Sequence, residues 1–359
     1  MLRAVGSSGS RQATLLDVAR LAGVHVSTVS RVLTDSPQLN IRPATRARVE
    51  AAAAELRYRP NATARALRSA STGALGMLVP SLRNPVYSEI IRGAFERAWE
   101  RDFVVVLAED RGGGEAERAY ERLVEQGRID GLLIAGVRPD SLLPERAAGA
   151  SVPFVFVNRR QPGGHNVSMR EEDAAAMAAE HLLGLGHTRV AHLAGPADID
   201  TARRRVAGFL AVARGRGIEP RVVHAAFDER AGHEAMLALL EAEDPPTGVF
   251  VSNINQAIGA LAAVRVAGRR VPDDVSLIAY DDDPIGDFLF PPLTAIRMPL
   301  HELGAAGVDA IMARIGGRPA ADVTVQTAPE LVVRASTAEA SPRPTPSRRA
   351  RSSARARRS

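Results

Sequence analysis

The chain has 359 residues, of which 45% are hydrophobic and 24% charged, and its formal net charge is +5. This length and composition predict a globular protein of two or three domains. The absence of cysteine excludes disulfides, thiolate zinc sites and cysteine nucleophiles, and no run of 18 apolar residues is available to span a membrane. The first residues lack the apolar segment of a secretory signal, so we expect a cytoplasmic protein.

Two basic ends flank an acidic middle. Residues 1–70 hold 11 arginines and 4 acidic residues, and residues 341–359 hold 7 arginines and no acidic residue. Residues 71–340 contain 28 basic and 37 acidic residues. This asymmetry indicates that one end meets a polyanion such as nucleic acid, although tails that only aid solubility give the same pattern.

The amino-terminal part is predicted to be helical. Residues 1–13 are small, polar and without periodicity, which predicts a disordered arm. Two short amphipathic helices are predicted within residues 15–33, on either side of Gly23, and a third, rich in Ala, Glu and Arg, over 43–58. A helix-start signal opens the segment 60–69, which is too short to be stable alone.

From Thr72 onward, short apolar runs alternate with longer helical stretches. The apolar runs predict strands at 73–79, 103–108, 131–135, 154–157, 189–194, 222–226, 248–252, 275–280 and 293–298. The stretches between them predict helices at 86–100, 115–127, 172–185, 200–216, 231–242, 256–267 and 299–316. This alternation is typical of doubly wound parallel α/β sheets, and the units suffice for two of them. Two short strands are expected to close the globular part.

The stretch TLLDVARLAGVHVSTVSRVL, residues 14–33, carries the most informative signal. Gly23 stands where the first helix must stop, because glycine adopts left-handed dihedrals without strain. In the second helix, an outward face is predicted to carry Val26, Ser27, Ser30 and Arg31. A helix, a short turn and a second helix form the helix-turn-helix, whose second helix can lie in the major groove of DNA. A plain helical hairpin has the same pattern, but a compact, basic, terminal unit favours DNA binding.

This region resembles the DNA-binding domain of the LacI/GalR family of bacterial transcription regulators. The resemblance rests on T-L-x-D-V-A-x-x-A-G-V, S-T-V-S-R-V-L, T-R-x-R-V (45–49), E-L-x-Y-x-P-N (55–61) and A-x-x-L (64–67). It continues to about Thr337 through HLLGLGHTRVAHLAGP, VPDDVSLIAYDD and ELVVRAST. The resemblance implies an α/β protein with an all-α, lambda-repressor-like helix-turn-helix domain. A periplasmic-binding-protein-like regulatory domain of two doubly wound parallel-sheet subdomains would follow.

The resemblance also implies domain boundaries. The helix-turn-helix domain would cover 14–59 and a hinge helix with its linker 60–70. The effector-binding and dimerisation domain, of two interleaved α/β subdomains, would cover 71–337. A disordered, Arg/Ser/Pro-rich tail is expected over 338–359.

Roles on DNA follow from the same resemblance. Val26 and Ser27 would begin the recognition helix and set operator preference, and Arg31 would reach a guanine through its bidentate fork. Contacts with phosphates, which fix register without reading sequence, would come from Thr14, Thr28, Ser30 and Arg46.

The hinge segment supplies three further expected DNA contacts. Asn61 stands at its start, Leu67 would insert as a wedge into the central minor groove, and Arg68 would follow the backbone or the groove floor. Two departures from the family occur earlier in the chain. His25 and Arg42 replace the serines that usually cap the second and third helices.

Two doubly wound halves place a ligand cleft at the carboxyl ends of their strands. There the resemblance implies that Arg205 forks onto hydroxyls or a carboxylate and that Phe227 stacks on an apolar ligand face, beside Asn253 and Asp281. These groups suit a polyol. The chain departs from the family in having Asn253-Ile254 for Asn-Asp and Arg170-Glu171 for Asp-Asn. Three alternatives for the effector therefore remain: an unusual sugar, an acidic metabolite, or no effector at all.

Enzyme motifs are missing from the sequence: the eight histidines form no HExxH, and there is no Walker A motif. We predict a sequence-specific transcriptional regulator, in this family usually a repressor, and not an enzyme. It would bind a pseudo-palindromic double-stranded DNA operator as a homodimer and respond to a small, sugar-like effector. No cofactor, metal or membrane is expected, and the protein would be associated with the nucleoid. The alternative is a solute-binding protein that delivers a small polar ligand to a transporter.

Overall fold

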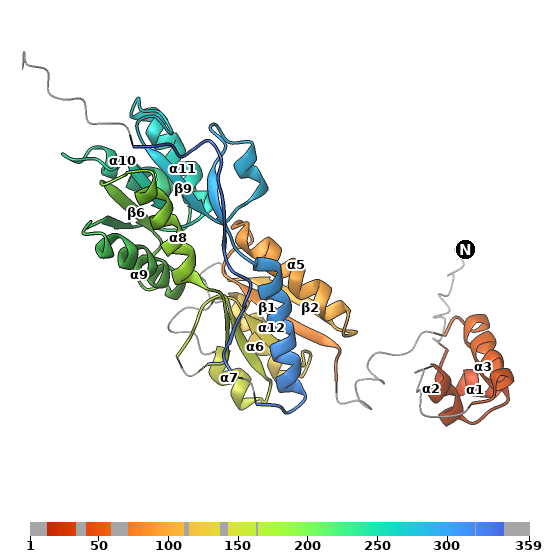
Figure 1. The fold of residues 1–359 in the computed structure, drawn as a ribbon. Helices are drawn as coiled ribbons and strands as arrows, with labels where there is room; N and C mark the ends of the chain where they lie inside the picture. The colour runs from red at the N-terminus through yellow and green to blue at the C-terminus, as the bar shows by residue number, and fades with distance from the viewer. Residues whose placement is uncertain are drawn as a thin grey trace, which may run out of the picture. The chain divides into compact units, whose positions relative to one another are not determined.

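The computed structural model describes residues 13–33, 41–58, 71–110, 115–136, 143–162, 164–319 and 321–340. They belong to two compact units that divide after Thr72. The first unit is helical and the second is α/β (Figure 1). Residues 1–12 of the expected arm and residues 341–359 of the expected tail lie outside the described residues.

The helical unit consists of α1 (Leu15–Ala22), α2 (Val26–Leu33) and α3 (Pro43–Glu55). As predicted, α1 ends at Gly23, which has a left-handed φ of 62°. The three helices bury one small core formed by Val18, Ala19, Ala22, Val29, Val32, Val49 and Ala52. This packing fixes the direction of α2 relative to α1 and α3.

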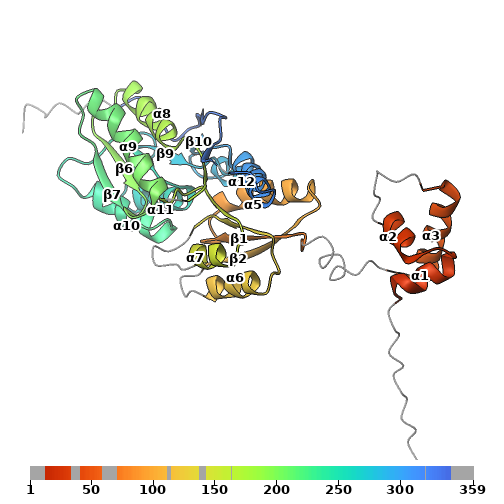
Figure 2. The same cartoon turned by 90° about the horizontal axis from the view of Figure 1, so that it is seen from below.

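The first lobe of the α/β unit is built on a six-stranded sheet in the order β11-β5-β4-β3-β1-β2, with all neighbours parallel. Its strands are β1 (Ala74–Val79), β2 (Val104–Glu109), β3 (Gly131–Ile134), β4 (Phe154–Val157), β5 (Asn166–Ser168) and β11 (Val323–Thr324). Helices α5 (Val86–Trp99) and α12 (Leu300–Ile315) cover one face. The opposite face is covered by α6 (Glu115–Glu125) and α7 (Leu143–Gly149) (Figure 2).

The second lobe repeats this design, with the strand order β12-β10-β9-β8-β6-β7. Its strands are β6 (Val190–Ala194), β7 (Arg221–His224), β8 (Gly248–Val251), β9 (Ser276–Tyr280), β10 (Thr294–Arg297) and β12 (Glu330–Val332). Its helices pair as α8 (Glu171–Gly184) with α9 (Asp200–Gly215) and α10 (Glu229–Leu240) with α11 (Ile254–Val266). A short 3-10 helix, η1 (Pro284–Asp287), follows β9. Only β12 runs antiparallel to its neighbour among the described strands.

The chain passes between the lobes three times: from β5 to α8, from β10 to α12 and from β11 to β12. The predicted pair of doubly wound sheets is therefore present, with the lobes interleaved in sequence. The described chain continues to Ala340, whose N–H donates to the Leu185 carbonyl at 2.8 Å. This contact lies three residues beyond the domain end expected from the sequence.

Helices α5 and α12 cross at very short range in the first lobe. A Cβ on Gly93 would lie 2.0 Å from the His301 carbonyl oxygen, and one on Gly304 would lie 2.0 Å from that of Ile90. The two backbones touch because neither glycine has a side chain. In the parts of the chain that the structure covers, no helix combines the length and the apolarity required to cross a bilayer.

Candidate functional site

The first helix of the small unit starts with a complete capping box. The Thr14 N–H donates to Asp17 Oδ2 at 2.9 Å, and the Asp17 N–H donates back to Thr14 Oγ1 at 3.3 Å. This reciprocal pair satisfies amide groups that the helix leaves without partners. Thr14 is exposed, so its hydroxyl both fixes the start of α1 and lies at the surface.

The cap of α2 is supplied by an unexpected residue. His25 stands where a serine was expected, and its Nδ1 accepts from the Ser27 N–H at 3.3 Å and lies 2.8 Å from Ser27 Oγ. The His25 carbonyl accepts from the N–H groups of Thr28 and Val29. The imidazole ring thus takes the role of the lost serine. Arg42 makes no side-chain cap for α3, but Pro43 at the first helical position has no N–H to satisfy.

The predicted outward face of α2 is only partly correct. Val26 is half-buried and packs against the core of the unit, because its spacing of three and seven residues from Val29 and Leu33 places it on their side of the helix. Ser27, Thr28 and Ser30 are half-buried, and Arg31 is exposed.

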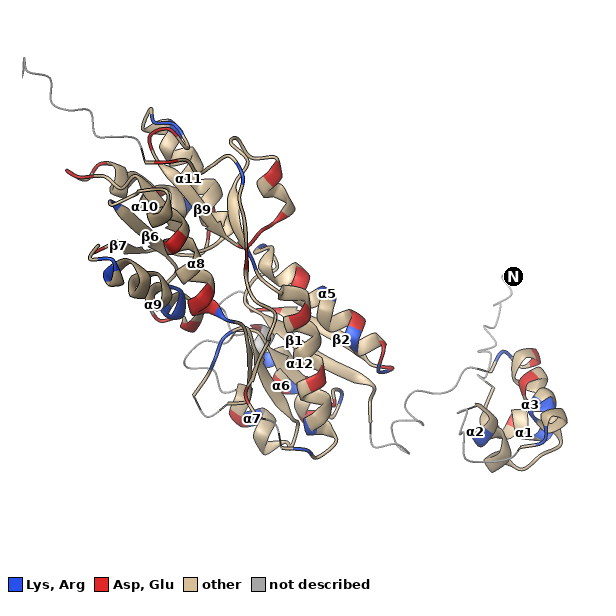
Figure 3. Cartoon of the chain, viewed as in Figure 1, with Lys and Arg blue, Asp and Glu red and all other residues tan. Residues whose placement is uncertain are grey.

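Basic residues occur on both α2 and α3 of this unit (Figure 3). Arg46 on α3 is half-buried and lies 3.9 Å from Glu50. The three expected hinge contacts, Asn61, Leu67 and Arg68, lie outside the described residues.

In the α/β unit, the four predicted effector residues Arg205, Phe227, Asn253 and Asp281 line one cavity between the lobes. The first lobe contributes Asn84, Val86, Tyr87, Asn158 and Arg159 to the same cavity, and Thr201 completes the second lobe's side. Its volume is about 20 Å³. A water molecule needs roughly 10–15 Å³, so the cavity has room for little more than one water and is closed to a sugar-sized ligand.

Arg205 is bound by the protein itself. Its side chain is only 5% exposed, and Nε donates to Glu171 Oε2 at 2.7 Å while Nη1 donates to the Ser252 carbonyl at 2.6 Å. The guanidinium carbon lies 3.4 Å from the centre of the Tyr280 ring. Burial lowers the pKa of Arg205, but the carboxylate of Glu171 opposes this strongly and the net pKa is raised. The predicted fork onto a ligand stays a prediction. Because Nε and one N–H of Nη1 are engaged by the protein, such a fork would use the remaining N–H groups of Nη1 and Nη2.

Asn253 also has structural partners. Its side-chain oxygen accepts from the Gln256 N–H at 2.8 Å, which caps α11, and its amide group donates to the Phe227 carbonyl at 3.3 Å. The Phe227 ring packs over Gly195, where an added Cβ would lie 2.1 Å from the ring. These contacts fix two walls of the cavity.

Asp281 is the most unusual residue of the cavity. It is 4% exposed, its φ is 72°, and Oδ1 has no hydrogen-bond partner among the described residues. Burial raises its pKa to about 7, although Arg205 acts in the opposite direction. A left-handed backbone at a non-glycine residue is strained, and such strain is concentrated at functional sites.

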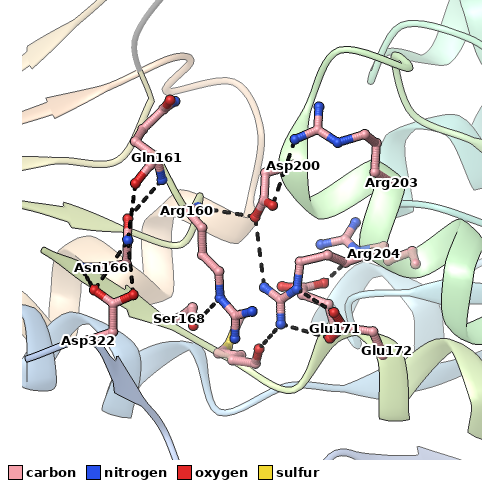
Figure 4. A network of polar contacts seen from close by, with 12 residues as sticks. Arg160, Gln161, Asn166, Ser168, Glu171, Glu172, Asp200, Arg203, Arg204 and Asp322 are labelled. Carbon is pink, nitrogen blue, oxygen red and sulfur yellow. Dashed lines mark hydrogen bonds and ion pairs between the residues drawn. The ribbon is translucent and has the colours of Figure 1, made fainter. Parts of the chain in front are cut away.

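A polar network ties the lobes together beside this cavity (Figure 4). The Arg160 N–H, after β4 of the first lobe, donates to Asp200 Oδ2 at the start of α9 at 3.1 Å. Arg204 donates to both oxygens of Glu172 at 2.8 Å and to the Met169 carbonyl at 2.6 Å. The network joins the first crossing segment to α9, and it would have to rearrange if the lobes separated.

Sequence reasoning missed the supporting residues of the site. Glu171 was noted only as a departure from the family pattern, and Tyr280, whose hydroxyl donates to Glu171 at 2.6 Å, was not considered. A role for Glu171 could have been predicted, because a carboxylate at the start of a largely apolar helix needs a partner when it is buried. The contact of Tyr280 with Glu171 could not have been predicted, since 109 residues separate the two in the sequence.

Comparisons with known proteins agree with this architecture. The family described as bacterial regulatory proteins, lacI family, matches residues 14–61, and the periplasmic binding protein-like domain matches residues 179–337. The ribose operon repressor of Escherichia coli strain K12 is 34% identical over 90% of this chain and 99% of its own length. The HTH-type transcriptional repressor PurR of Photobacterium profundum is 31% identical over 90% of this chain and 98% of its own.

Solved structures give the same result. The lac repressor dimer bound to operator and the anti-inducer ONPF superposes with a TM-score of 0.78 at 30% identity, covering 91% of this chain and all of the other. The complex of the transcriptional regulator CelR with cellobiose gives a TM-score of 0.69 at 32% identity, covering 90% of this chain and all of the other.

The chain belongs to the LacI family of bacterial regulatory proteins. It is a DNA-binding transcriptional regulator and not an enzyme. The solute-binding alternative does not hold, because the matching relatives are repressors and the match includes the amino-terminal helices.

Proposed function

We propose that this regulator is a repressor that binds a pseudo-palindromic operator as a homodimer, and that a sugar or sugar derivative in the cleft controls its binding. The observation that carries the proposal is the presence, in one chain, of a helix-turn-helix unit and of a closed cavity lined by all four predicted effector residues. Such a protein works in the cytoplasm on nucleoid DNA.

On the operator, α2 is the recognition helix. Arg31, exposed in its last turn, suits a bidentate contact with guanine, and Ser27 stands at its amino-terminal end, where helices of this kind meet base edges. Val26 sets operator preference partly by holding α2 on the core. The phosphate contacts fall to Thr14, Thr28, Ser30 and Arg46.

The segment that follows the three helices couples DNA to the regulatory unit. We assign 14–59 to the DNA-binding domain, 60–70 to the hinge and 71–337 to the regulatory domain. In the hinge, Leu67 is the minor-groove wedge, and Asn61 and Arg68 contact the DNA beside it.

The cleft holds the effector. Related proteins are named for ribose, and structures of two family members contain ribose and cellobiose. In this chain Asp281 and Asn253 offer polar contacts, Phe227 offers an apolar face, and Arg205 offers its remaining N–H groups. Because the closed cavity is too small for a sugar, the ligand enters when the lobes separate, and its binding shifts their equilibrium.

Dimer formation is supported by exposed apolar side chains on both lobes. In the second lobe Phe288 and Phe290 are 84% and 85% exposed, and in the first lobe Trp99 and Val104 are exposed as well. Large exposed apolar side chains are commoner at interaction surfaces than on the rest of a folded domain. A twofold dimer also places two recognition helices on two half-sites.

Selection of binding sites from random DNA by the purified protein, at a stated salt concentration, tests the proposal. The expected result is a short pseudo-palindrome with a central C-G step. Arg31→Ala and Leu67→Ala should lose or blur this motif. Salt-sensitive binding without any motif would mean that the basic ends merely coat DNA.

A further inference from the structure

A fully buried carboxylate lies directly behind the effector cavity. Glu171 begins α8 and has no exposed surface. Its Oε2 accepts from Arg205 Nε at 2.7 Å and from the Tyr280 hydroxyl at 2.6 Å. Its Oε1 has no hydrogen-bond partner among the described residues. The start of a helix stabilises a negative charge, so this position favours a carboxylate.

Glu171 changes what Arg205 offers to a ligand. Arginine binds carboxylates and phosphates best when it presents two parallel N–H groups and an unneutralised charge. Here Nε is bonded to Glu171, Nη1 to the Ser252 carbonyl, and Tyr280 covers one face of the guanidinium group. The cation therefore faces the cavity with its own buried counter-ion and with fewer N–H groups left for a ligand.

The remaining buried polar atoms of the cavity are mostly acceptors. Asn158 Oδ1 and Asp281 Oδ1, both from residues that line the cavity, have no hydrogen-bond partner among the described residues. Arg159 Nε is the corresponding donor. The charge of Arg205 is matched by that of Glu171, and Asp281 adds a second carboxyl group to the cavity lining. An uncharged ligand that donates hydroxyl groups satisfies these acceptors, whereas a ligand anion would lie buried beside two carboxyl groups.

We propose that Glu171 is a specificity-determining residue, which neutralises Arg205 so that the cleft accepts uncharged, hydroxyl-donating ligands and rejects their carboxylate and phosphate derivatives. This inference rests on the proposed effector role of the cleft. It selects the polyol among the effector classes that the sequence left open, and it excludes the acidic metabolite.

The test compares Glu171→Gln with the neighbouring control Glu172→Gln. Glutamine keeps the shape of the side chain and an acceptor for Arg205, but removes the charge. Glu172 is the matched control, because its side chain is 44% exposed and pairs with Arg204 instead of Arg205. Glu171→Asn, the residue that the family pattern has here, provides a second variant if the first folds poorly.

The probes are ribose, glucose, galactose and cellobiose, each with its aldonic acid and its phosphate ester, and their binding is measured by calorimetry and thermal unfolding. In the wild-type protein the sugar that binds should do so at least about tenfold more tightly than its acid, a difference of about 1.4 kcal/mol. Glu171→Gln should lower this ratio about tenfold or more, and Glu172→Gln should keep it. Equal binding of sugar and acid by the wild type, or an unchanged ratio in Glu171→Gln, would overturn the inference.

Inorganic phosphate gives a readout that needs no knowledge of the effector. It should raise the unfolding temperature of the regulatory unit more in Glu171→Gln and Glu171→Asn than in Glu172→Gln or the wild type, because Arg205 then lacks its buried counter-ion. Equal shifts in all four proteins would contradict the inference. If the proposed function is wrong, the selection experiment will yield no DNA motif. That result does not affect the difference in phosphate-induced unfolding temperature between the variants.

Discussion

The guanidinium group of Arg205 lies 3.4 Å from the ring centre of Tyr280, and both residues bond the same oxygen of Glu171. The three residues come from α9, β9 and α8, so they hold three elements of the second lobe in one arrangement. Buried groups that bond one another in this way restrict each other's movement and form a rigid part of the cleft. Arg205 and its two partners therefore form one rigid wall of the cavity that the first lobe faces.

The contacts among Arg205, Tyr280 and Glu171 predict that loss of the arginine strongly destabilises the regulatory unit. Arg205→Met should lower the free energy of unfolding of the regulatory unit by about 3–5 kcal/mol, because it leaves the carboxylate of Glu171 buried without its cation. Arg214→Met is the control. Arg214 pairs with Glu219 in solvent and its side chain is 57% exposed, so the change should cost far less stability than Arg205→Met. Urea unfolding of the full chain measures both, and similar costs for the two variants would refute the role given to the buried pair.

Asp281 predicts a pH dependence of stability. Its pKa of about 7 lies above the ordinary value of 3.8, chiefly because of burial, with Arg205 opposing and Glu171 and Asp283 adding to the rise. The folded state therefore keeps a proton that the unfolded state releases, and the contribution of Asp281 to stability falls as pH rises from about 4 to about 7. The loss can reach about 4 kcal/mol at roughly 1.4 kcal/mol per pKa unit.

Asp281→Asn isolates this contribution, since asparagine tolerates the left-handed backbone and does not titrate. The variant should gain stability relative to the wild type as pH is raised from 5 to 8, as measured by urea unfolding at each pH. A difference between the two proteins that stays constant across this range would show that Asp281 is ionised in the folded protein throughout.

On DNA, two arginines should behave differently. Arg31→Ala should cost about 1–3 kcal/mol of operator binding and relax the choice of base at one position of each half-site. Arg46→Ala should weaken binding to all sequences alike and reduce the salt dependence by about one counter-ion. Fluorescence anisotropy with the selected operator and its single-base variants, at several salt concentrations, separates the two. Loss of base preference in Arg46→Ala alone would reverse the assignment.

The imidazole cap of α2 is testable by replacement. His25→Ala should destabilise the start of the helix by about 0.5–2 kcal/mol, whereas His25→Ser should preserve it, since serine is a preferred cap. Amide hydrogen exchange of the first turn of α2, measured on the full chain, reports this change. Equal protection of these amides in His25→Ala and the wild type would mean that the 3.3 Å bond to Ser27 contributes nothing.

Phe288 provides a test of the dimer. Its side chain is 84% exposed, so Phe288→Ser should leave the fold intact and shift the monomer–dimer equilibrium toward the monomer. Analytical ultracentrifugation across a concentration series measures the shift, and Ile285→Ser, in the adjacent 3-10 helix, is a neighbouring comparison. A wild-type protein that sediments as a monomer at all concentrations would contradict the dimer.

The sequence was informative where local physics decides the structure. Gly23 ends α1 because only its dihedral preference permits the turn, and apolar runs such as 275–280 become buried strands because both faces of the sheet are covered. The three-residue strand β5 was missed, since so short a segment has no readable period. Helix α7 was missed for a similar reason, because seven residues carry little amphipathic pattern.

At the candidate site, residue positions were easier to predict than their partners. Arg205, Phe227, Asn253 and Asp281, which the family resemblance placed in the cleft, line one cavity. The side-chain oxygen of Asn253 caps a helix, and Arg205 is bonded to Glu171. Neither contact can be predicted from the spacing of residues in the sequence. Val26 was predicted to face outward, whereas in the structure it packs against the core of the helical unit.

The central claim is that ligand in the cleft controls DNA binding, and one measurement tests it most directly. The affinity for the selected operator is measured at fixed salt with and without the sugar that stabilises the regulatory unit, using scrambled DNA as the control. The account predicts that saturating sugar changes operator affinity at least about fivefold, the lower end of ordinary allosteric coupling, and leaves binding to scrambled DNA unchanged. A sugar that binds in the cleft while operator affinity stays the same would contradict it.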